Sequence, residues 1–217
     1  MSQAPSTLIL DLDGTLIDSK PVILECFGKA VEAVFPGRAF DGDSVRLGPP
    51  IRRMFQISFP EATEIEVDEL LRVFRNHYDR EGPIKTLAYE GALKLLAHCR
   101  TRGIALFVAT NKPLRISEAI LVHLKLDHYF RSVVASDSVQ PPFAGKGEMV
   151  RHLLEAGKLE PAETWYVGDS PEDAAAAAEC SLPFVWAAYG YGRLGKAERK
   201  SVFRTIQTLA ELTELLA

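Results

Sequence analysis

The chain has 217 residues, of which 47% are hydrophobic and 25% charged, and its formal net charge is −4. This length and composition are typical of a globular protein with one large domain, or with one domain that carries a smaller insert. No Lys/Arg cluster favours a nucleic-acid polymer or an anionic membrane surface as partner, and no apolar run approaches the about 20 residues of a membrane-spanning helix.

The amino terminus and the cysteines indicate the compartment. Residues 1–5 carry neither the positive flank nor the apolar segment of a secretory signal. Cys26, Cys99 and Cys180 are far apart and form no Cys-x-x-Cys pair. We therefore expect a cytoplasmic protein with buried, reduced thiols and with neither a disulfide nor a zinc site.

An apolar segment, residues 7–10, leads directly into Asp11-Leu12-Asp13-Gly14-Thr15. The apolar run predicts a buried strand, and the residues after it predict a turn at its carboxyl end, where open α/β sheets bind ligands. Two carboxylates one residue apart can divide the work: one is held by a cation and attacks, and the other moves a proton. This chemistry is that of an aspartyl-phosphate, although a simple Asp-Gly turn contains the same residues.

Helical patterns then fill the chain as far as residue 86. Apolar residues repeat at helical spacing in three segments, residues 22–34, 51–55 and 67–78. The third helix is predicted to end at Gly82-Pro83. These segments predict a small helical subdomain without strands.

From residue 89 onward, helix and strand patterns alternate, which predicts βαβ units and a parallel sheet. The predicted strands are residues 104–109, 132–135, 164–167 and 183–187. The predicted helices are residues 91–102, 116–124, 146–157 and 174–178, followed by a capped helix after Thr208. The fold class is therefore α/β, with a helical insert directly after the first strand.

Polar residues follow two of these strands. Thr110 ends one strand, and Gly168-Asp169-Ser170 with Asp173 follows another. Because the carboxyl ends of parallel strands meet at one sheet edge, we expect these groups near Asp11. Asp173 is also spaced from Ser170 as the acid of a helix capping box, so that structural role stays open.

Four motifs occur in the order Asp11-Leu12-Asp13-Gly14-Thr15, Thr110, Lys146, and Gly168-Asp169-Ser170 with Asp173. Through them the whole chain resembles the phosphatases of the haloacid dehalogenase superfamily, in the phosphoglycolate phosphatase-like branch with a helical cap. The resemblance implies a Rossmann-like α/β core formed by residues 1–17 and 87–217, and a cap formed by residues 18–86.

The resemblance also implies catalytic roles. Asp11 would attack phosphorus, and Asp13 would protonate the leaving oxygen and then activate water. Mg²⁺ would be held by Asp11, the backbone carbonyl of Asp13 and Asp169, with Asp173 as a further ligand or directly behind them. An oxygen-ligated cation is needed there because a carboxylate must approach a phosphate dianion.

Thr110 and Lys146 would bind the transferring phosphoryl group through a hydroxyl and an ammonium. Gly147 follows Lys146 where family members often have proline, so a solvated lysine at a helix start stays open. We expect Asn111 to line the site mouth and Arg52 or its neighbour Arg53 to face a second anionic group of the substrate. Two exposed arginines on a helix are the alternative.

Asp13 favours phosphate esters over dehalogenation, because displacing a halide needs no proton donor at a leaving oxygen. The expected partner is therefore a small phosphorylated metabolite, hydrolysed with Mg²⁺. A mutase of the β-phosphoglucomutase type shares both aspartates and the cap, and it stays open. A non-catalytic phosphoacceptor resembling response regulators is disfavoured, because those domains lack the helical insert and carry the acceptor on a later strand.

Overall fold

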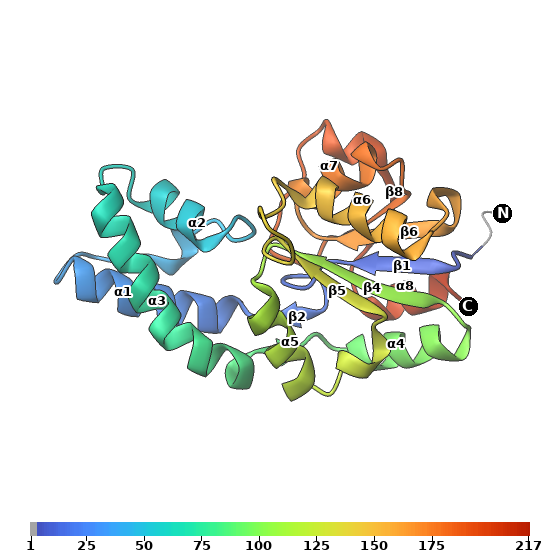
Figure 1. The fold of residues 1–217 in the computed structure, drawn as a ribbon, viewed down its shortest axis with the longest axis horizontal. Helices are drawn as coiled ribbons and strands as arrows, with labels where there is room; N and C mark the ends of the chain where they lie inside the picture. The colour runs from blue at the N-terminus through green and yellow to red at the C-terminus, as the bar shows by residue number, and fades with distance from the viewer. Residues whose placement is uncertain (1–3) are drawn as a thin grey trace.

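A six-stranded parallel sheet forms the centre of the computed structural model, which describes residues 4–217 (Figure 1). From edge to edge it consists of β5 (Ser132–Ala135), β4 (Ala105–Thr110), β1 (Thr7–Leu10), β6 (Thr164–Gly168), β7 (Phe184–Ala187) and β8 (Val202–Ile206). Leu10 pairs with Val108 on β4 and with Val167 on β6. The central strands therefore end at one level, and the residues that follow them meet at one edge. The predicted α/β fold with a parallel sheet is confirmed.

The edge strand β8 has no clear signature in the sequence. Arg204 and Thr205 are exposed in its middle, and only Ile206 is fully buried. The strand pairs with β7 alone, across a register shift at Phe184 and Val185. A strand with one partner and one fully buried residue needs no long apolar run, and this explains why the pattern does not predict it.

Two layers of helices cover the sheet. One layer consists of α4 (Ala92–Thr101), α5 (Leu114–His123) and α8 (Leu209–Leu215), and the other of α6 (Lys146–Gly157) and α7 (Pro171–Glu179) (Figure 1). Leu8 and Leu10 belong to the core under the first layer, and Ile9 belongs to the core under the second. The side chains of β1 thus alternate between two apolar layers, which is why the whole strand is apolar.

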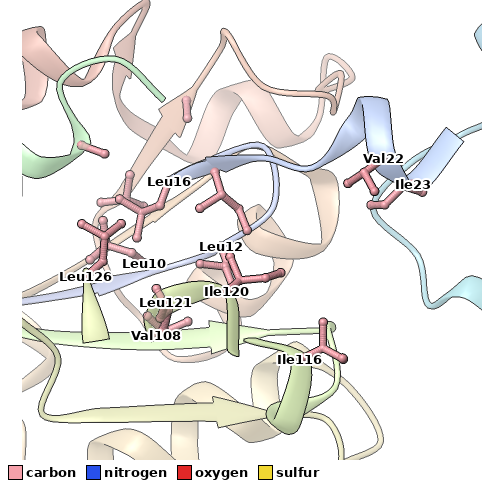
Figure 2. Close-up of a cluster of buried hydrophobic side chains, with 14 of the residues drawn as sticks. Leu10, Leu12, Leu16, Val22, Ile23, Val108, Ile116, Ile120, Leu121 and Leu126 are labelled. Carbon is pink, nitrogen blue, oxygen red and sulfur yellow. The ribbon is translucent and has the colours of Figure 1, made fainter. Parts of the chain in front are cut away.

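The core beside α5 extends toward the inserted helices. Figure 2 shows Leu10 and Leu12 close to Val108, Ile120 and Leu121, with Val22 and Ile23 further along the same chain. This continuity places the start of the insert beside the carboxyl end of β1.

The insert contains α1 (Lys20–Val34), α2 (Ile51–Ser58) and α3 (Glu64–Lys85), which lie to one side of the sheet (Figure 1). The chain enters through β2 (Ile17–Asp18) and leaves through β3 (Leu87–Ala88), and these two strands pair antiparallel. Short 3-10 turns lie at Gly42–Ser44, Asp127–Tyr129, Pro161–Glu163 and Glu198–Ser201. The insert itself is helical, as expected, but its two connections form a short ladder.

The predicted end of the third helix at Gly82-Pro83 is wrong, because α3 continues to Lys85. Proline lacks an N–H and crowds the carbonyl four residues before it, but it leaves the N–H groups of the following residues able to donate. The backbone N–H of Thr86 donates to the Gly82 carbonyl at 3.1 Å. A side chain at Gly82 would lie 2.9 Å from the Tyr78 ring, so glycine lets the aromatic ring pack on this turn.

Aromatic rings fill the centre of the insert. Phe27 stacks on Phe55 with 4.0 Å between ring centroids, and Phe55 meets the edge of Phe74 at 6.2 Å. Phe74 in turn stacks on Tyr78 at 5.1 Å. This row of rings connects the middle of the insert to the side of α3 that faces the sheet edge.

Part of the amino-terminal segment, from which we expect no secretory signal, lies outside the described residues. These are residues 1–3 of the segment 1–5. Within residues 4–217, none of the helices has the length and apolar character needed to cross a membrane. Cys26 and Cys99 are buried, Cys180 is half-buried, and all three thiols are free.

The burial of β1 predicts a large cost for truncating Leu8, which is fully buried. Leu8→Ala should lower the free energy of unfolding by about 2–5 kcal/mol, through lost burial and the cavity left behind. The matched control is Leu93→Ala, since Leu93 is 58% exposed on α4; it should change the free energy by less than about 0.5 kcal/mol. Urea unfolding followed by circular dichroism measures both, and equal losses would contradict the central place of β1.

Candidate active site

Three carboxylates meet at the carboxyl edge of the sheet. Asp11 follows β1, Asp169 follows β6, and Asp173 lies in the first turn of α7. One carboxylate oxygen of each lies within 4.8 Å of the others, and all three residues are buried. The structure therefore brings together three of the acidic residues that the sequence motifs single out.

Lys146, the first residue of α6, points into this cluster. Its Nζ atom donates to Asp11 Oδ1 at 2.7 Å and to Asp173 Oδ1 at 2.6 Å. The lysine is buried, so it is not the solvated residue of an ordinary helix start. Burial opposes the charge on Lys146, but the carboxylates of Asp11 and Asp173 outweigh this effect, and the pKa of the ammonium is raised.

Asp173 uses both carboxylate oxygens within the protein. Its Oδ1 accepts from Lys146 and from the Tyr166 hydroxyl at 3.0 Å. Its Oδ2 accepts from the backbone N–H groups of Asp169 at 3.1 Å and Ser170 at 2.9 Å, and from the Ser170 hydroxyl at 2.6 Å. Asp173 therefore forms the capping box with Ser170 that the sequence leaves open.

Asp169 is held by the loop after β7. Its Oδ2 accepts from the backbone N–H groups of Tyr191 at 2.6 Å and Gly192 at 2.9 Å. Gly14 has a φ of +81°, and a side chain there would lie 2.5 Å from Asp169 Oδ2. Glycine in the first motif is thus required for the close approach of the two strand ends as well as for the turn.

The cluster carries more negative than positive charge. Lys146 is its single ammonium among the described residues, against three carboxylates. Burial, together with the neighbouring acids, raises the pKa of Asp11 well above its ordinary value and the pKa of Asp169 to about 6. Carboxylate oxygens with a deficit of positive charge are the donor set that Mg²⁺ prefers, so these residues fit a divalent cation.

Asp13 lies at the boundary between the sheet edge and the insert. Its Oδ1 accepts from the hydroxyl of Ser19, and its Oδ2 lies 3.2 Å from Lys112 Nζ. The same Nζ atom donates to the Tyr78 hydroxyl of α3 at 2.7 Å. The Asp13 carboxylate is therefore oriented from both sides, and Lys112 connects it directly to the insert.

Thr110 and Asn111 line the same edge. Thr110 is buried, and its Oγ1 accepts from the backbone N–H of Lys112 at 3.2 Å, so the hydroxyl proton is still available. Asn111 Nδ2 donates to Glu172 Oε2 at 2.6 Å. Both residues contribute to the wall of a cavity between the sheet edge and the insert.

This cavity has a volume of about 590 Å³ and joins the two parts of the chain. Asp11, Asp13 and Lys146 line it from the sheet, and α2 and α3 line it from the insert. Arg52 is also on the lining, but its guanidinium pairs with Glu64 Oε2 at 2.7 Å and with Asp68. Its charge is already matched within the insert.

Sequence patterns do not identify two of the contacting residues. Ser19 looks like an ordinary helix start, yet its side chain makes no cap hydrogen bond and donates to Asp13 instead. Tyr191 supplies a backbone N–H to Asp169, and its hydroxyl accepts from the backbone N–H of Ser19 at 2.7 Å. The glycines on either side of Tyr191, a few residues after β7, are the signal that could have indicated a tight functional loop.

Comparison with known proteins places this geometry in a family. Residues 8–187 match the family described as haloacid dehalogenase-like hydrolase. A phosphoglycolate phosphatase of Agrobacterium fabrum is 30% identical over 193 residues, which are 84% of this chain and 80% of that protein. A protein of Mycobacterium tuberculosis named tyrosine-protein kinase PtkA is 30% identical over 218 residues, which are 99% of this chain and 73% of that protein.

A solved structure agrees over the whole length. The crystal structure of a predicted phosphatase from Clostridium acetobutylicum matches with a TM-score of 0.86 and 25% sequence identity. The match covers 99% of this chain and 99% of that chain. The resemblance drawn from the four motifs is thus confirmed, and the chain belongs to the haloacid dehalogenase-like hydrolase family.

Proposed function

We propose that this enzyme, a phosphatase of the haloacid dehalogenase-like hydrolase family, hydrolyses a small phosphomonoester through an aspartyl-phosphate on Asp11. The observation that carries the proposal is the placement of Asp11 at the centre of the site: its Oδ1 accepts from Lys146, and Asp169 and Asp173 lie beside it. A relative named phosphoglycolate phosphatase supports a small phosphorylated metabolite as substrate. The relative named a kinase is likewise defined by phosphoryl transfer.

The proposed reaction has two steps. A carboxylate oxygen of Asp11 forms a bond to phosphorus while the bond from phosphorus to the ester oxygen breaks, and Asp13 gives its proton to that oxygen. Asp13 then takes a proton from water, whose oxygen attacks phosphorus and breaks the bond to Asp11. The hydrogen bond from Ser19 and the contact with Lys112 keep the Asp13 carboxylate in one place for both steps.

The phosphoryl oxygens would be bound by Lys146 and by the free hydroxyl proton of Thr110. Asp11, the backbone carbonyl of Asp13 and Asp169 would hold Mg²⁺, which would supply positive charge to offset the repulsion between the nucleophile and the phosphate. Because both oxygens of Asp173 are already used, we propose that Asp173 positions Lys146 and the Asp169 backbone rather than binding the cation directly.

Residues 18–86 would act as a cap that excludes water from the reaction, with residues 1–17 and 87–217 as the catalytic core. The paired strands β2 and β3 connect this cap to the core. Lys112 also links the two parts, because it contacts Asp13 and donates to the Tyr78 hydroxyl of the cap. Asn111 and Arg52 would lie beside the bound substrate at the mouth. We propose that the enzyme works in the cytoplasm, where phosphorylated metabolites are found.

The first test is Asp11→Asn, which removes the nucleophile while keeping the size of the side chain. Phosphate release from p-nitrophenyl phosphate and from a panel of metabolite phosphates should fall below detection. Asp127→Asn is the matched control, because Asp127 is exposed in a 3-10 turn and should keep full activity. Turnover by pure Asp11→Asn protein would rule out the aspartyl-phosphate.

The second test is Asp13→Asn, which removes the acid and base. With an alkyl phosphate, kcat should fall by about 10²–10⁴-fold. Nitrophenolate leaves without a proton, so the variant should still give a rapid burst of nitrophenolate from p-nitrophenyl phosphate, followed by slow turnover. A loss of less than about tenfold on the alkyl phosphate would remove Asp13 from this role.

The third test concerns the cation. EDTA should abolish phosphate release, and added Mg²⁺ should restore it. Mg²⁺ should also raise the melting temperature of the wild type, because it binds the folded state, and should not raise that of Asp169→Asn. Since the pKa of Asp169 is raised to about 6, protons should compete with Mg²⁺ and weaken this shift as the pH falls from about 7 to 5. An identical shift in Asp169→Asn would contradict the site.

A further inference from the structure

The wall of the cavity opposite the carboxylates is apolar. It is formed by the cap residues Ile23, Leu47, Ile51, Met54, Leu71 and Phe74. Ile23, Met54, Leu71 and Phe74 belong to the buried core of the cap, and Leu47 and Ile51 are half-buried at the cavity surface. With the phosphoryl group at Asp11, this wall is where the alcohol part of the substrate must lie.

The size of the cavity also exceeds what a two-carbon acid requires. Its volume of about 590 Å³ lies within the range of roughly 300–1,000 Å³ that is typical of pockets enclosing drug-sized ligands. A phosphoryl group with glycolate attached would leave much of the apolar wall uncovered. A larger alcohol would cover it and remove that surface from water.

The arginines on the lining offer little to a second anionic group. Arg52 pairs with Glu64 and Asp68, and Arg115 pairs with Asp79. A carboxylate placed against the apolar wall would lose its hydration without gaining a partner, which is costly.

Arg75 also lines the cavity, but its side chain is exposed on α3. Water already solvates its charge, and ion pairs at such exposed positions contribute little to binding. The lining as a whole therefore favours an uncharged, apolar leaving group.

We infer that the substrate is a phosphomonoester whose alcohol carries an aromatic ring or an extended apolar surface, bound against the wall of Ile23, Leu47, Ile51, Met54, Leu71 and Phe74. This inference rests on the proposed phosphatase function and names its substrate class. The phosphate is recognised at the sheet edge, and the apolar body is recognised by the cap.

The test compares 2-phenylethyl phosphate with phosphoglycolate, since both have an unactivated alcohol as leaving group and differ in the body that meets the wall. The wild type should have a kcat/KM at least about tenfold higher for 2-phenylethyl phosphate, because each apolar group that fills a pocket contributes about that much to discrimination. Equal values, or a preference for phosphoglycolate, would overturn the inference while leaving the phosphatase function intact.

A matched pair of variants on α2 locates the effect. Ile51→Arg places a cation in the wall and should reduce the preference for 2-phenylethyl phosphate by at least about tenfold. Ile57→Arg adds the same charge to the same helix at a position that is 43% exposed and off the cavity lining, and it should leave the preference unchanged. Equal effects of the two variants would contradict the assignment of the wall. The wild-type comparison does not depend on the folding of either variant.

Calorimetric binding to Asp11→Asn in the presence of Mg²⁺ separates the inference from the proposed function. If the wild type releases phosphate from neither ester, nor from p-nitrophenyl phosphate or any metabolite phosphate of the panel, the proposed function fails. Tighter binding of 2-phenylethyl phosphate to Asp11→Asn would still support the apolar wall, and equal or tighter binding of phosphoglycolate would overturn it. Arg75→Gln completes the set, because a tenfold rise in KM for phosphoglycolate alone would show that Arg75 provides an anion site.

Discussion

The burial of three carboxylates around one ammonium is the constraint on which the rest of this structure depends. Lys146 pairs with Asp11 and Asp173, and Asp169 lies beside them. Buried charges are tolerated only when they are paired and hydrogen-bonded, so the surroundings must supply donors. The loop after β7 and the residues between β6 and α7 do so, through backbone N–H groups aimed at Asp169 and Asp173. The remaining negative charge makes the site suitable for a divalent cation.

The second organising feature is the contact between the inserted helices and Asp13. Lys112 lies between Asp13 and Tyr78, and Tyr78 ends the row of aromatic rings that fills the cap. Asp13 is thus held by the same lysine that links α3 to the sheet edge. This arrangement explains how one cavity can combine a charged floor at the sheet edge with an apolar wall on the inserted helices.

Much of the fold and part of the site could be predicted from local sequence. The apolar residues of β1 indicate a strand buried on both faces, and the alternation of helices and strands after residue 89 indicates a parallel sheet. Parallel strands bring their carboxyl ends together, so the placement of Asp11 and Asp169 at one edge followed from strand assignment alone. The spacing of Ser170 and Asp173 likewise indicated the capping box that the structure contains.

The sequence by itself therefore determined the fold class, the family and the acidic motif residues, because these depend on periodicity and on short spacings. Only the tertiary structure decided which side chains meet across long separations. Lys112 reaches Asp13 from the segment after β4, and Tyr191 reaches Asp169 from the loop after β7. Tertiary contacts also decided two local features. Packing allows α3 to continue past Pro83, and pairing with β7 makes β8 a strand. Local propensity is weak at such positions, so contacts that form only in the folded chain determine their structure.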